Sequence, residues 1–279
     1  MLVGCDFSSS PSKRKPIVVA LGSSSLGRVH LANILKFESL DAWSHWLESP
    51  QEWVGGFDLP FGLPRELVET LNWPKDWLAC LRHFSAMSRD TVRQHFKAFC
   101  DARPVGKKFA HRKTDGPAGS SPSMKWVNPP VAFMLHAGIP RLLDAGVTFP
   151  GLHVPHQDQN ISKRIALEAY PGLLARELIG NRSYKSDEKA KQTPERLIAR
   201  KMILQALELG QTRLDLRLKL THAQHDALIA DASGDSLDAV LCMVQAAWAE
   251  LQHMNDHACY GLPIFDSIEG WIVTAEPLS

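Results

Sequence analysis

Hydrophobic residues near the N-terminus occur in short runs that predict strands. Residues 2–7, 16–21 and 28–37 are apolar or alternating segments rich in Val, Ile and Leu. The segments SSSPSKRK and GSSSLG, which lie between these runs, have the composition of turns. We therefore predict three antiparallel strands at the start of the chain.

The pattern then changes to helical spacing and back to strand. Ser39 is in position to cap a helix whose apolar stripe runs from Leu40 to Leu47. Residues 52–58 predict a further strand, buried on both faces, which Pro60 ends. A strand that follows a helix indicates a parallel crossover onto the earlier strands.

From about residue 64 to residue 160 the pattern is mainly helical and predicts an insertion. Apolar residues recur at helical spacing from Leu67 to Leu81, and Ser88 is in position to cap another helix. Residues 106–126 are first basic and then small and polar, which is typical of a loop. We predict a single domain over residues 1–279 with a helical insertion at about 64–160.

Three further elements complete the predicted fold. Residues 161–170 have strand character, and Pro194 begins a helix with an apolar series from Leu197 to Leu207. The last long helix begins at residues 233–235 and carries one apolar stripe. The whole order predicts an α/β protein with a mixed sheet, three antiparallel strands followed by parallel ones, flanked by helices.

Composition indicates an ordinary globular protein, because 44% of the residues are hydrophobic and 22% are charged. The 31 basic and 30 acidic residues nearly balance, so net charge argues neither for nor against a nucleic-acid partner. Five cysteines without a CxxC pair favour reduced thiols in small core positions of a cytosolic protein. No apolar run approaches the roughly 18 residues that cross a bilayer, so we expect a soluble, cytoplasmic protein without a membrane partner.

Acidic residues stand where four of the predicted elements begin or end. They are Asp6, Asp58, Glu168, and the pair Asp235 and Asp238. One acidic residue at the end of an element is ordinary, but this recurrence beside apolar runs predicts that the carboxylates gather at one edge of the sheet. Such a cluster needs a cation, and oxygen ligands favour the hard ions Mg²⁺ and Mn²⁺.

Several motifs in these segments carry a resemblance to a known family. They are GCD at 4–6, DLPFGLP at 58–64, EAYPG at 168–172, SYK at 183–185, DSLDA at 235–239 and EGWI at 269–272. In order and spacing the chain resembles, over most of its length, the family catalogued as domain of unknown function 429, whose members are predicted to have a ribonuclease H-like fold. The resemblance implies three antiparallel strands, a helix, a parallel fourth strand, a fifth strand and a closing helix. It also implies that Asp6, Asp58, and Asp238 or Asp235 hold divalent metal.

These features lead to the hypothesis of a metal-dependent nuclease or related phosphodiesterase. Two divalent ions can neutralise charge on the attacking and leaving oxygens and lower the pKa of a bound water. In this hypothesis Asp6 bridges the ions, Asp58 and Asp238 each complete one coordination sphere, and Glu168 or Asp235 orients the water. The choice between DNA, RNA and nucleotide substrates stays open, as does the oligomeric state.

Each carboxylate also has a purely structural interpretation. Asp6 is suited to the turn that follows it, and Asp58 to the turn before Pro60. Asp235 can cap the last helix, and Asp238 lies where the helix dipole favours a negative charge. Glu168 is either an exposed carboxylate at a strand end or the partner of an arginine such as Arg164. Position directly after an apolar strand, together with the resemblance, favours metal for Asp6.

Two basic segments are candidates for contacts with a phosphate backbone. The first comprises Lys107, Lys108, Arg112 and Lys113. Trp126 follows it and is available for stacking, and the second segment begins at Lys185 and extends to Arg200. A solvated loop is the alternative interpretation of such runs. For the whole chain, the alternative to a nuclease is a non-catalytic protein that binds a nucleotide or a partner on the same fold.

Overall fold

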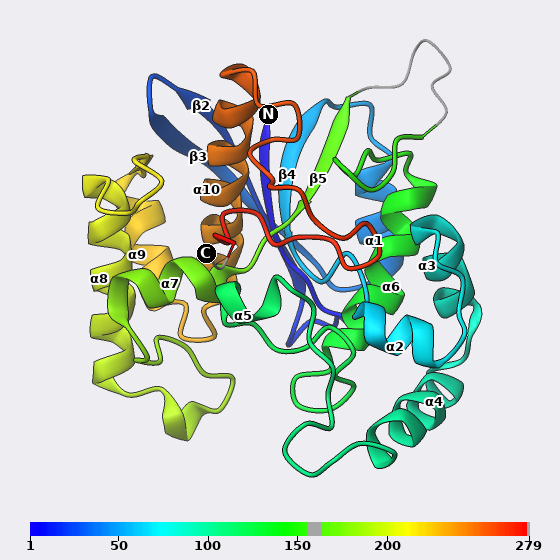
Figure 1. The fold of residues 1–279 in the computed structure, drawn as a ribbon. Coiled ribbons are helices and arrows are strands. Elements are labelled where there is room, and N and C mark those ends of the chain that lie inside the picture. The colour runs from blue at the N-terminus through cyan, green and yellow to red at the C-terminus, as the bar shows by residue number, and fades with distance from the viewer. Residues whose placement is uncertain (156–162, 278–279) are drawn as a thin grey trace.

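A six-stranded mixed sheet forms the centre of the computed structural model, which describes residues 1–155 and 163–277 (Figure 1). Its strands lie in the order β5-β4-β1-β2-β3-β6. In chain order they are β1 (Leu2–Asp6), β2 (Ile17–Ser25), β3 (Arg28–Phe37), β4 (Trp53–Asp58), β5 (Arg164–Glu168) and β6 (Arg217–Lys219). The first three pair in antiparallel fashion, and β4, β5 and β6 join the sheet in parallel. The predicted α/β class with a mixed sheet is therefore confirmed.

Strand register places two of the predicted carboxylates side by side. The parallel pairing of β1 with β4 sets Asp6 opposite Asp58 and Gly4 opposite Gly56. On the far side of β4, β5 ends at Glu168, level with the end of β4. Because the carboxyl ends of these parallel strands meet at one edge of the sheet, all three carboxylates lie at that edge.

The β2–β3 hairpin differs from the prediction in the position of its turn. Residues 22–25, which were expected in the turn, continue β2, and Ser25 still pairs with Arg28. The turn is the Leu26–Gly27 pair, with φ angles of 49° and 70°. Two residues of positive φ match the twist of the strands they join. Pairing therefore continues to the tip of the hairpin, although the register shifts once, between Leu21 and Gly22.

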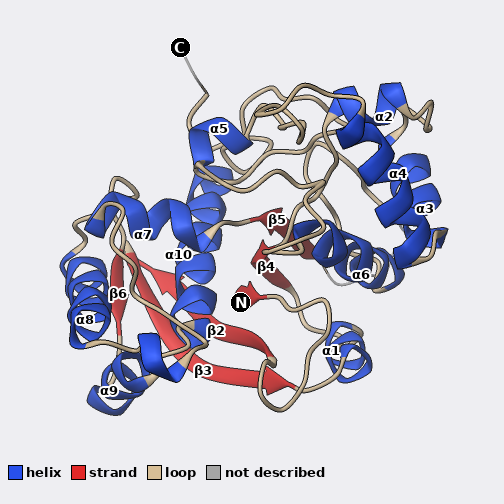
Figure 2. Ribbon diagram, turned by 90° about the horizontal axis from the view of Figure 1, so that it is seen from below, coloured by secondary structure: helices blue, strands red, loops and turns tan. Residues whose placement is uncertain are grey.

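Helices cover both faces of the sheet (Figure 2). One face packs against α7 (Pro171–Ile179), α8 (Pro194–Leu209), α9 (His222–Ala230) and α10 (Asp235–Met254). The other packs against α1 (Leu40–Leu47) and helices of the inserted region, namely α2 (Arg65–Thr70), α3 (Trp77–Ala86), α4 (Arg89–Asp101) and α6 (Val131–Asp144). The short helices α5 (Asp115–Ala118) and η1 (Lys189–Lys191) lie in connecting segments. Side chains alternate along β1, so Leu2 packs on the α10 side and Val3 on the α1 side.

Two predicted helix starts are confirmed by their caps. The Ser39 hydroxyl accepts a hydrogen bond from the Ala42 amide at 3.1 Å and caps α1. Ser88 accepts one from the Thr91 amide at 3.1 Å and caps α4. These serines satisfy amides that the first turn of a helix leaves without partners.

Two predictions about helices and cysteines are wrong. The N-cap of α10 is Gly234, and Asp235 makes no capping hydrogen bond. In α8, Leu197 and Ile198 of the apolar series are exposed, whereas Arg200, which a hydrophobic pattern does not select, is buried. Cys259 is exposed, whereas the other four cysteines are buried as predicted. The helices α7 and α9 and the strand β6 were not predicted.

Candidate active site

Two glycines bring α10 against the ends of β1 and β4. A Cβ atom on Gly4 would lie 2.0 Å from a backbone carbonyl oxygen of α10, and one on Gly56 would lie 2.4 Å from another. Only glycine permits such a close approach of helix and strand. Side chains two residues apart on a strand share a face, so Asp6 and Asp58 also face α10.

Asp238, in the first turn of α10, completes a group that we call the acidic cluster, comprising Asp6, Asp58 and Asp238. Asp238 is 0% exposed, and its negative charge raises the pKa of both other aspartates. Its own oxygens are engaged, since the Tyr184 hydroxyl donates to Oδ1 and the Lys185 ammonium donates to Oδ2. The structure thus brings together three of the carboxylates that the sequence assigned to one site.

The helix α8 holds the segment that supplies Tyr184 and Lys185. Arg200 donates to the backbone carbonyl of Tyr184 at 2.7 Å, and Arg196 donates to that of Lys185 at 2.9 Å. Both arginines were grouped with the basic residues suited to phosphate. In the structure their guanidinium groups position the segment that reaches the acidic cluster.

Burial and mutual repulsion disfavour charge on the acidic cluster. Burial raises the pKa of Asp6 well above its ordinary value, Asp238 adds to the rise, and Lys185 opposes it. Burial and the charge of Asp238 likewise raise the pKa of Asp58 to about 7, and Lys185 again opposes the rise. Burial also raises the pKa of Asp238 against the lowering effect of Lys185. The cluster therefore retains protons at a pH where ordinary aspartates are ionised, and a bound cation would displace them.

Asp6 and Asp58 have no polar partner for their side chains. Neither carboxylate accepts a hydrogen bond or forms an ion pair with any residue in the two described ranges. Asp235 differs, because Lys15 Nζ lies 2.7 Å from its Oδ1 and also 3.1 Å from Asp187. Burial alone lowers the pKa of Lys15, but the hydrogen bond and charge of Asp235 outweigh it and raise the pKa. The pair of Asp6 and Asp58 is therefore the part of the site that lacks a compensating charge of its own.

Glu168 belongs to a separate buried network. The two terminal nitrogens of Arg112 donate to its two oxygens at 2.6 and 2.7 Å, and the Phe61 amide donates at 2.8 Å. Arg112 also bonds Asp115 at 2.9 Å. Burial raises the pKa of Glu168, and Arg112 opposes this rise. The interpretation of Glu168 as the partner of an arginine is confirmed, although the arginine is Arg112 rather than Arg164. The alternative of an exposed carboxylate is wrong, because Glu168 is buried.

This network changes how the first basic segment is understood. The Arg112 side chain is only 1% exposed and fastens the loop of residues 106–126 to the sheet. Lys107, Lys108 and Lys113 are exposed, and none of them lines the cavities beside the acidic cluster. Contact of these lysines with nucleic acid stays a prediction, whereas Lys185 lies within the site itself.

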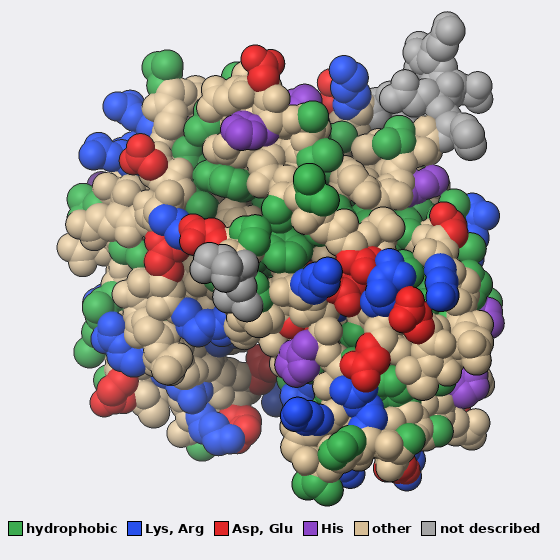
Figure 3. All heavy atoms as spheres, in the orientation of Figure 1, with side chains coloured by type: hydrophobic (Ala, Val, Ile, Leu, Met, Phe, Trp, Pro, Cys, Tyr) green, Lys and Arg blue, Asp and Glu red, His purple; other side chains and the backbone are tan. Residues whose placement is uncertain are grey.

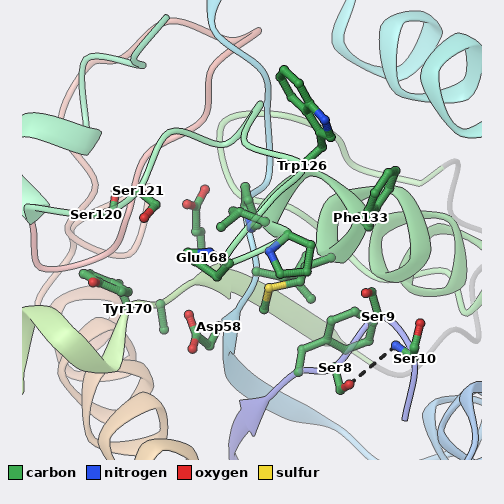
Figure 4. Close-up of a pocket in the computed structure, with 18 of the residues that line it drawn as sticks. Ser8, Ser9, Ser10, Asp58, Ser120, Ser121, Trp126, Phe133, Glu168 and Tyr170 are labelled. Atoms are coloured by element: carbon green, nitrogen blue, oxygen red, sulfur yellow. Dashed lines mark hydrogen bonds between the residues drawn. The ribbon is translucent and has the colours of Figure 1, made fainter. Parts of the chain in front are cut away.

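A cavity of about 750 Å³ opens beside the acidic cluster (Figure 4). Asp58 and Glu168 point toward it from the ends of β4 and β5, and residues 8–10 border it after β1. Trp126 and Phe133 of the inserted region form another part of its lining. In the space-filling view the molecule is hollowed between the α7–α8 side and the inserted helices, with basic side chains around the hollow (Figure 3). The inserted region therefore supplies a wall of the candidate site.

Metal-binding geometry depends on which carboxylates are free. Across residues 1–155 and 163–277, no group of three or more His, Cys, Asp or Glu side chains is arranged so that it could hold a metal ion. At Asp238 both oxygens are engaged by Tyr184 and Lys185, which leaves Asp6 and Asp58. Mg²⁺ is commonly bound through one or two carboxylates together with water and substrate phosphates. The donor chemistry of this pair fits Mg²⁺ or Mn²⁺ bound in that way.

Several residues near the site were not identified from the sequence. Lys15 lies in a segment with the composition of a turn, and Arg89 and Arg93, which line the cavity, belong to no motif. Glu269 accepts hydrogen bonds from the backbone amides of residues 65 and 113 at 2.9 and 2.8 Å. For Glu269 a signal existed, because it stands in the EGWI motif, whereas only the fold places the other three at the site.

No protein-family model, curated protein or solved structure matches the chain. Among the helices of the described residues, none combines the length and the apolar character needed to span a bilayer.

The fold and site define an α/β protein with a mixed sheet and a cavity at the edge where its carboxylates gather. The resemblance to domain of unknown function 429 stays a prediction.

Proposed function

We propose that the protein is a divalent-metal-dependent phosphodiesterase that cleaves nucleic acid. The observation that carries this proposal is the pair Asp6 and Asp58, two adjacent carboxylates without a partner among the described residues, of which Asp6 is buried and Asp58 is half-buried beside a large cavity. Isolated buried carboxylates are costly to keep. A cation that binds between them, together with a substrate phosphate, would remove that cost and give the pair a chemical purpose.

Charge neutralisation in this proposal is divided between an ion and the chain. An ion held by Asp6 and Asp58 would lower the pKa of a water molecule bound to it, and its positive charge would stabilise the negative charge of the phosphodiester. Lys185 lines the cavity with its side chain 39% exposed, and Lys15 lines it as well. Both ammonium groups are thus available to a phosphate, while Asp238 orients Lys185. The two-ion arrangement that also uses Asp238 and Asp235 requires both lysines to move away.

Glu168 has a supporting role in this proposal. It lines the cavity, but both its oxygens are engaged by Arg112. Because both oxygens are engaged, we propose that Glu168 holds the cavity wall in place rather than orienting an attacking water. The initial hypothesis, in which Glu168 acts on the water, would require the ion pair to open.

The finer fold assignment supports the same function. Three antiparallel strands, a helix, a parallel fourth strand, a fifth strand and a late helix are the order that a ribonuclease H-like fold requires. The carboxylates of β1, β4 and α10 also occupy the positions that the family resemblance assigns to metal. We therefore propose a ribonuclease H-like core, to which β6 is added at the β3 edge.

Calorimetric titration of Mn²⁺ tests the first step of the proposal. Wild-type protein should bind the ion, and the Asp6→Asn/Asp58→Asn variant should not, because the amides carry no negative charge. Asp58→Asn alone should reduce Mn²⁺-dependent cleavage of labelled oligonucleotides by about 10³-fold or more, as expected for loss of a metal ligand. Circular dichroism verifies that the variants fold. Full activity in Asp58→Asn would contradict the proposal.

One observation favours a second candidate, a non-catalytic protein that binds a nucleotide or a partner on the same fold. Lys185 and Lys15 already place positive charge beside Asp238 and Asp235. A site with its own cations can bind an anionic ligand without metal. If wild-type protein binds no Mn²⁺, either alone or with a cleavage-resistant phosphorothioate oligonucleotide, this candidate is selected.

A further inference from the structure

The acidic cluster lies where two cavities meet. The larger, of about 750 Å³, reaches toward the inserted helices, and the smaller, of about 320 Å³, lies against the start of α7 and residues 180–185. Asp58, Tyr170 and Lys185 line both cavities. A ligand centred on Asp58 therefore has room on two sides.

The larger cavity carries a basic and aromatic wall. The guanidinium groups of Arg89 and Arg93 each lie 5.0 Å from the centroid of the Phe133 ring. Arg89 is held by the Ser10 hydroxyl at 3.1 Å and by a neighbouring backbone carbonyl at 2.7 Å, and no carboxylate within the described ranges pairs with it. Arg93 contacts the exposed Asp90. Arginines beside aromatic rings can bind phosphates while bases stack on the rings.

The smaller cavity is also lined by arginines and an aromatic ring. The Arg176 guanidinium lies 5.3 Å from the centroid of the Tyr170 ring and donates to the backbone carbonyl of Ala118. Arg182 is exposed and donates to the carbonyl of Ile179 at 2.9 Å. Within the part of the chain that the structure describes, no carboxylate pairs with either arginine. Their positive charges are therefore available to an external anion.

We infer that the site takes single-stranded nucleic acid that passes through both cavities. One phosphodiester lies beside Asp58, and phosphates on either side of it contact arginines of the two walls. A mononucleotide would occupy only one cavity, and a duplex keeps its bases paired, so it cannot stack them on the half-buried rings of Trp126 and Tyr170. The inference rests on the proposed function for cleavage at Asp58, whereas binding itself requires no metal.

Fluorescence anisotropy in EDTA measures this binding without cleavage. The probes are labelled thymidine and uridine oligomers of about 12 nucleotides, a duplex of equal length and a dinucleotide. Single-stranded oligomers should bind about tenfold more tightly than either the duplex or the dinucleotide, because they alone reach both walls. Arg89→Gln/Arg93→Gln in the larger cavity and Arg182→Gln in the smaller should each weaken oligomer binding about five- to tenfold.

Arg28→Gln is the matched control, because Arg28 is exposed at the end of the sheet opposite the acidic cluster. If the double variant does not fold, Arg93→Gln, which alters an exposed side chain, replaces it. Loss of affinity in both cavities with an unchanged control supports the inference. Loss in one cavity only, no binding of the oligomers, or a duplex that binds as tightly, overturns it.

Cleavage assays separate this inference from the proposed function. Oligomer binding that depends on both sets of arginines, without any Mn²⁺-dependent cleavage, supports the inference and contradicts the proposed activity. Metal-dependent cleavage that neither set of arginines affects supports the proposed activity and overturns the inference. The thymidine and uridine oligomers distinguish DNA from RNA.

Discussion

Asp58 carries opposing demands of stability and function in a single side chain. It lies next to Asp6 in the sheet, and the charge of Asp238 also acts on it. Burial, together with the negative charges of Asp238 and Glu168, raises the pKa of Asp58 to about 7. In an unfolded chain an aspartate ionises near pH 4. Above neutral pH, Asp58 is therefore ionised in both the folded and the unfolded chain. Its negative charge is less favourable in the folded protein, so it lowers the stability of the fold.

Without metal, Asp58 should make stability depend on pH in a direction opposite to that of a salt-bridged aspartate. The folded-state pKa exceeds the unfolded value, so the free energy of unfolding should rise as pH falls from 8 through about 7 toward 4. Asp58→Asn removes this cost. In EDTA at pH 8 the variant should be more stable than wild type, by at most about 4 kcal/mol, and the difference should shrink toward pH 4.5.

Urea denaturation at both pH values measures this difference. Asp41→Asn provides the control, because the Asp41 side chain is 99% exposed. The difference in stability between this variant and wild type should change little between the two pH values. A variant that is less stable than wild type at pH 8 would show that Asp58 is stabilised rather than strained. In that event, the argument that Asp58 needs a bound cation to offset an unfavourable charge would no longer hold.

Among the elements, the closeness of α10 to the sheet is what assembles the acidic cluster. Gly4→Ala would place a methyl group 2.0 Å from a backbone oxygen of α10, which only a shift of the helix can relieve. We expect a loss of at least about 2 kcal/mol in the free energy of unfolding, together with weakened Mn²⁺ binding as Asp238 moves. Gly116→Ala is the control, because no heavy atom of the described residues lies within 4 Å of its added Cβ. Equal stability of the two variants would contradict this account.

The same scale shows what the sequence could and could not predict. The strands β1 and β3 and the caps Ser39 and Ser88 follow local rules of alternation and capping, and the structure confirms them. The buried face of α8 does not, because Arg200 occupies a core position in order to bind two backbone carbonyls. Local hydrophobic patterns predict which apolar side chains are buried, but they do not identify a charged side chain that is buried because of its hydrogen bonds.

The candidate site shows a similar division. That Asp6 and Asp58 share a sheet edge follows from two strands that each end in an aspartate, and the pairing register confirms it. Their surroundings could not be predicted, since Arg112 meets Glu168 across 56 residues of sequence. No spacing rule connects residues that only the folding of an inserted loop brings together. Whether these carboxylates bind metal stays a prediction.

At the level of the whole molecule, near-neutral net charge conceals a segregated distribution. Carboxylates gather at one sheet edge, while three arginines without a carboxylate partner among the described residues, Arg89, Arg176 and Arg182, line the cavities on both sides of it. The formal net charge of +1 is the balance of all 31 basic and 30 acidic residues of the chain, so it does not reveal this local separation. Global charge therefore carries little information about this site, and the local arrangement determines which ligand fits.

The inserted helices and the sheet share one hydrophobic cluster, so we expect them to unfold together. This cluster joins Val3 and Cys5 of β1 to Phe84 and Phe96 of the inserted region. Phe96 is 0% exposed and stacks on Phe84 with ring centroids 5.9 Å apart. Phe96→Ala should lower the free energy of unfolding by about 3 to 5 kcal/mol. Because the transition is shared, hydrogen-exchange protection should fall equally in β1 and in α4.

Lys97→Ala, the next position of α4, is the matched control, because the Lys97 side chain is 69% exposed and its one ion pair among the described residues is with the exposed Asp101. Its effect should stay within about 0.5 kcal/mol. Native-state hydrogen exchange reads the two regions separately in one experiment. If Phe96→Ala reduces protection in α4 while the β1 amides keep theirs, the inserted region is a separate folding unit. The cavity wall could then open without unfolding the sheet, and the larger cavity would have to be treated as a variable rather than a fixed part of the site.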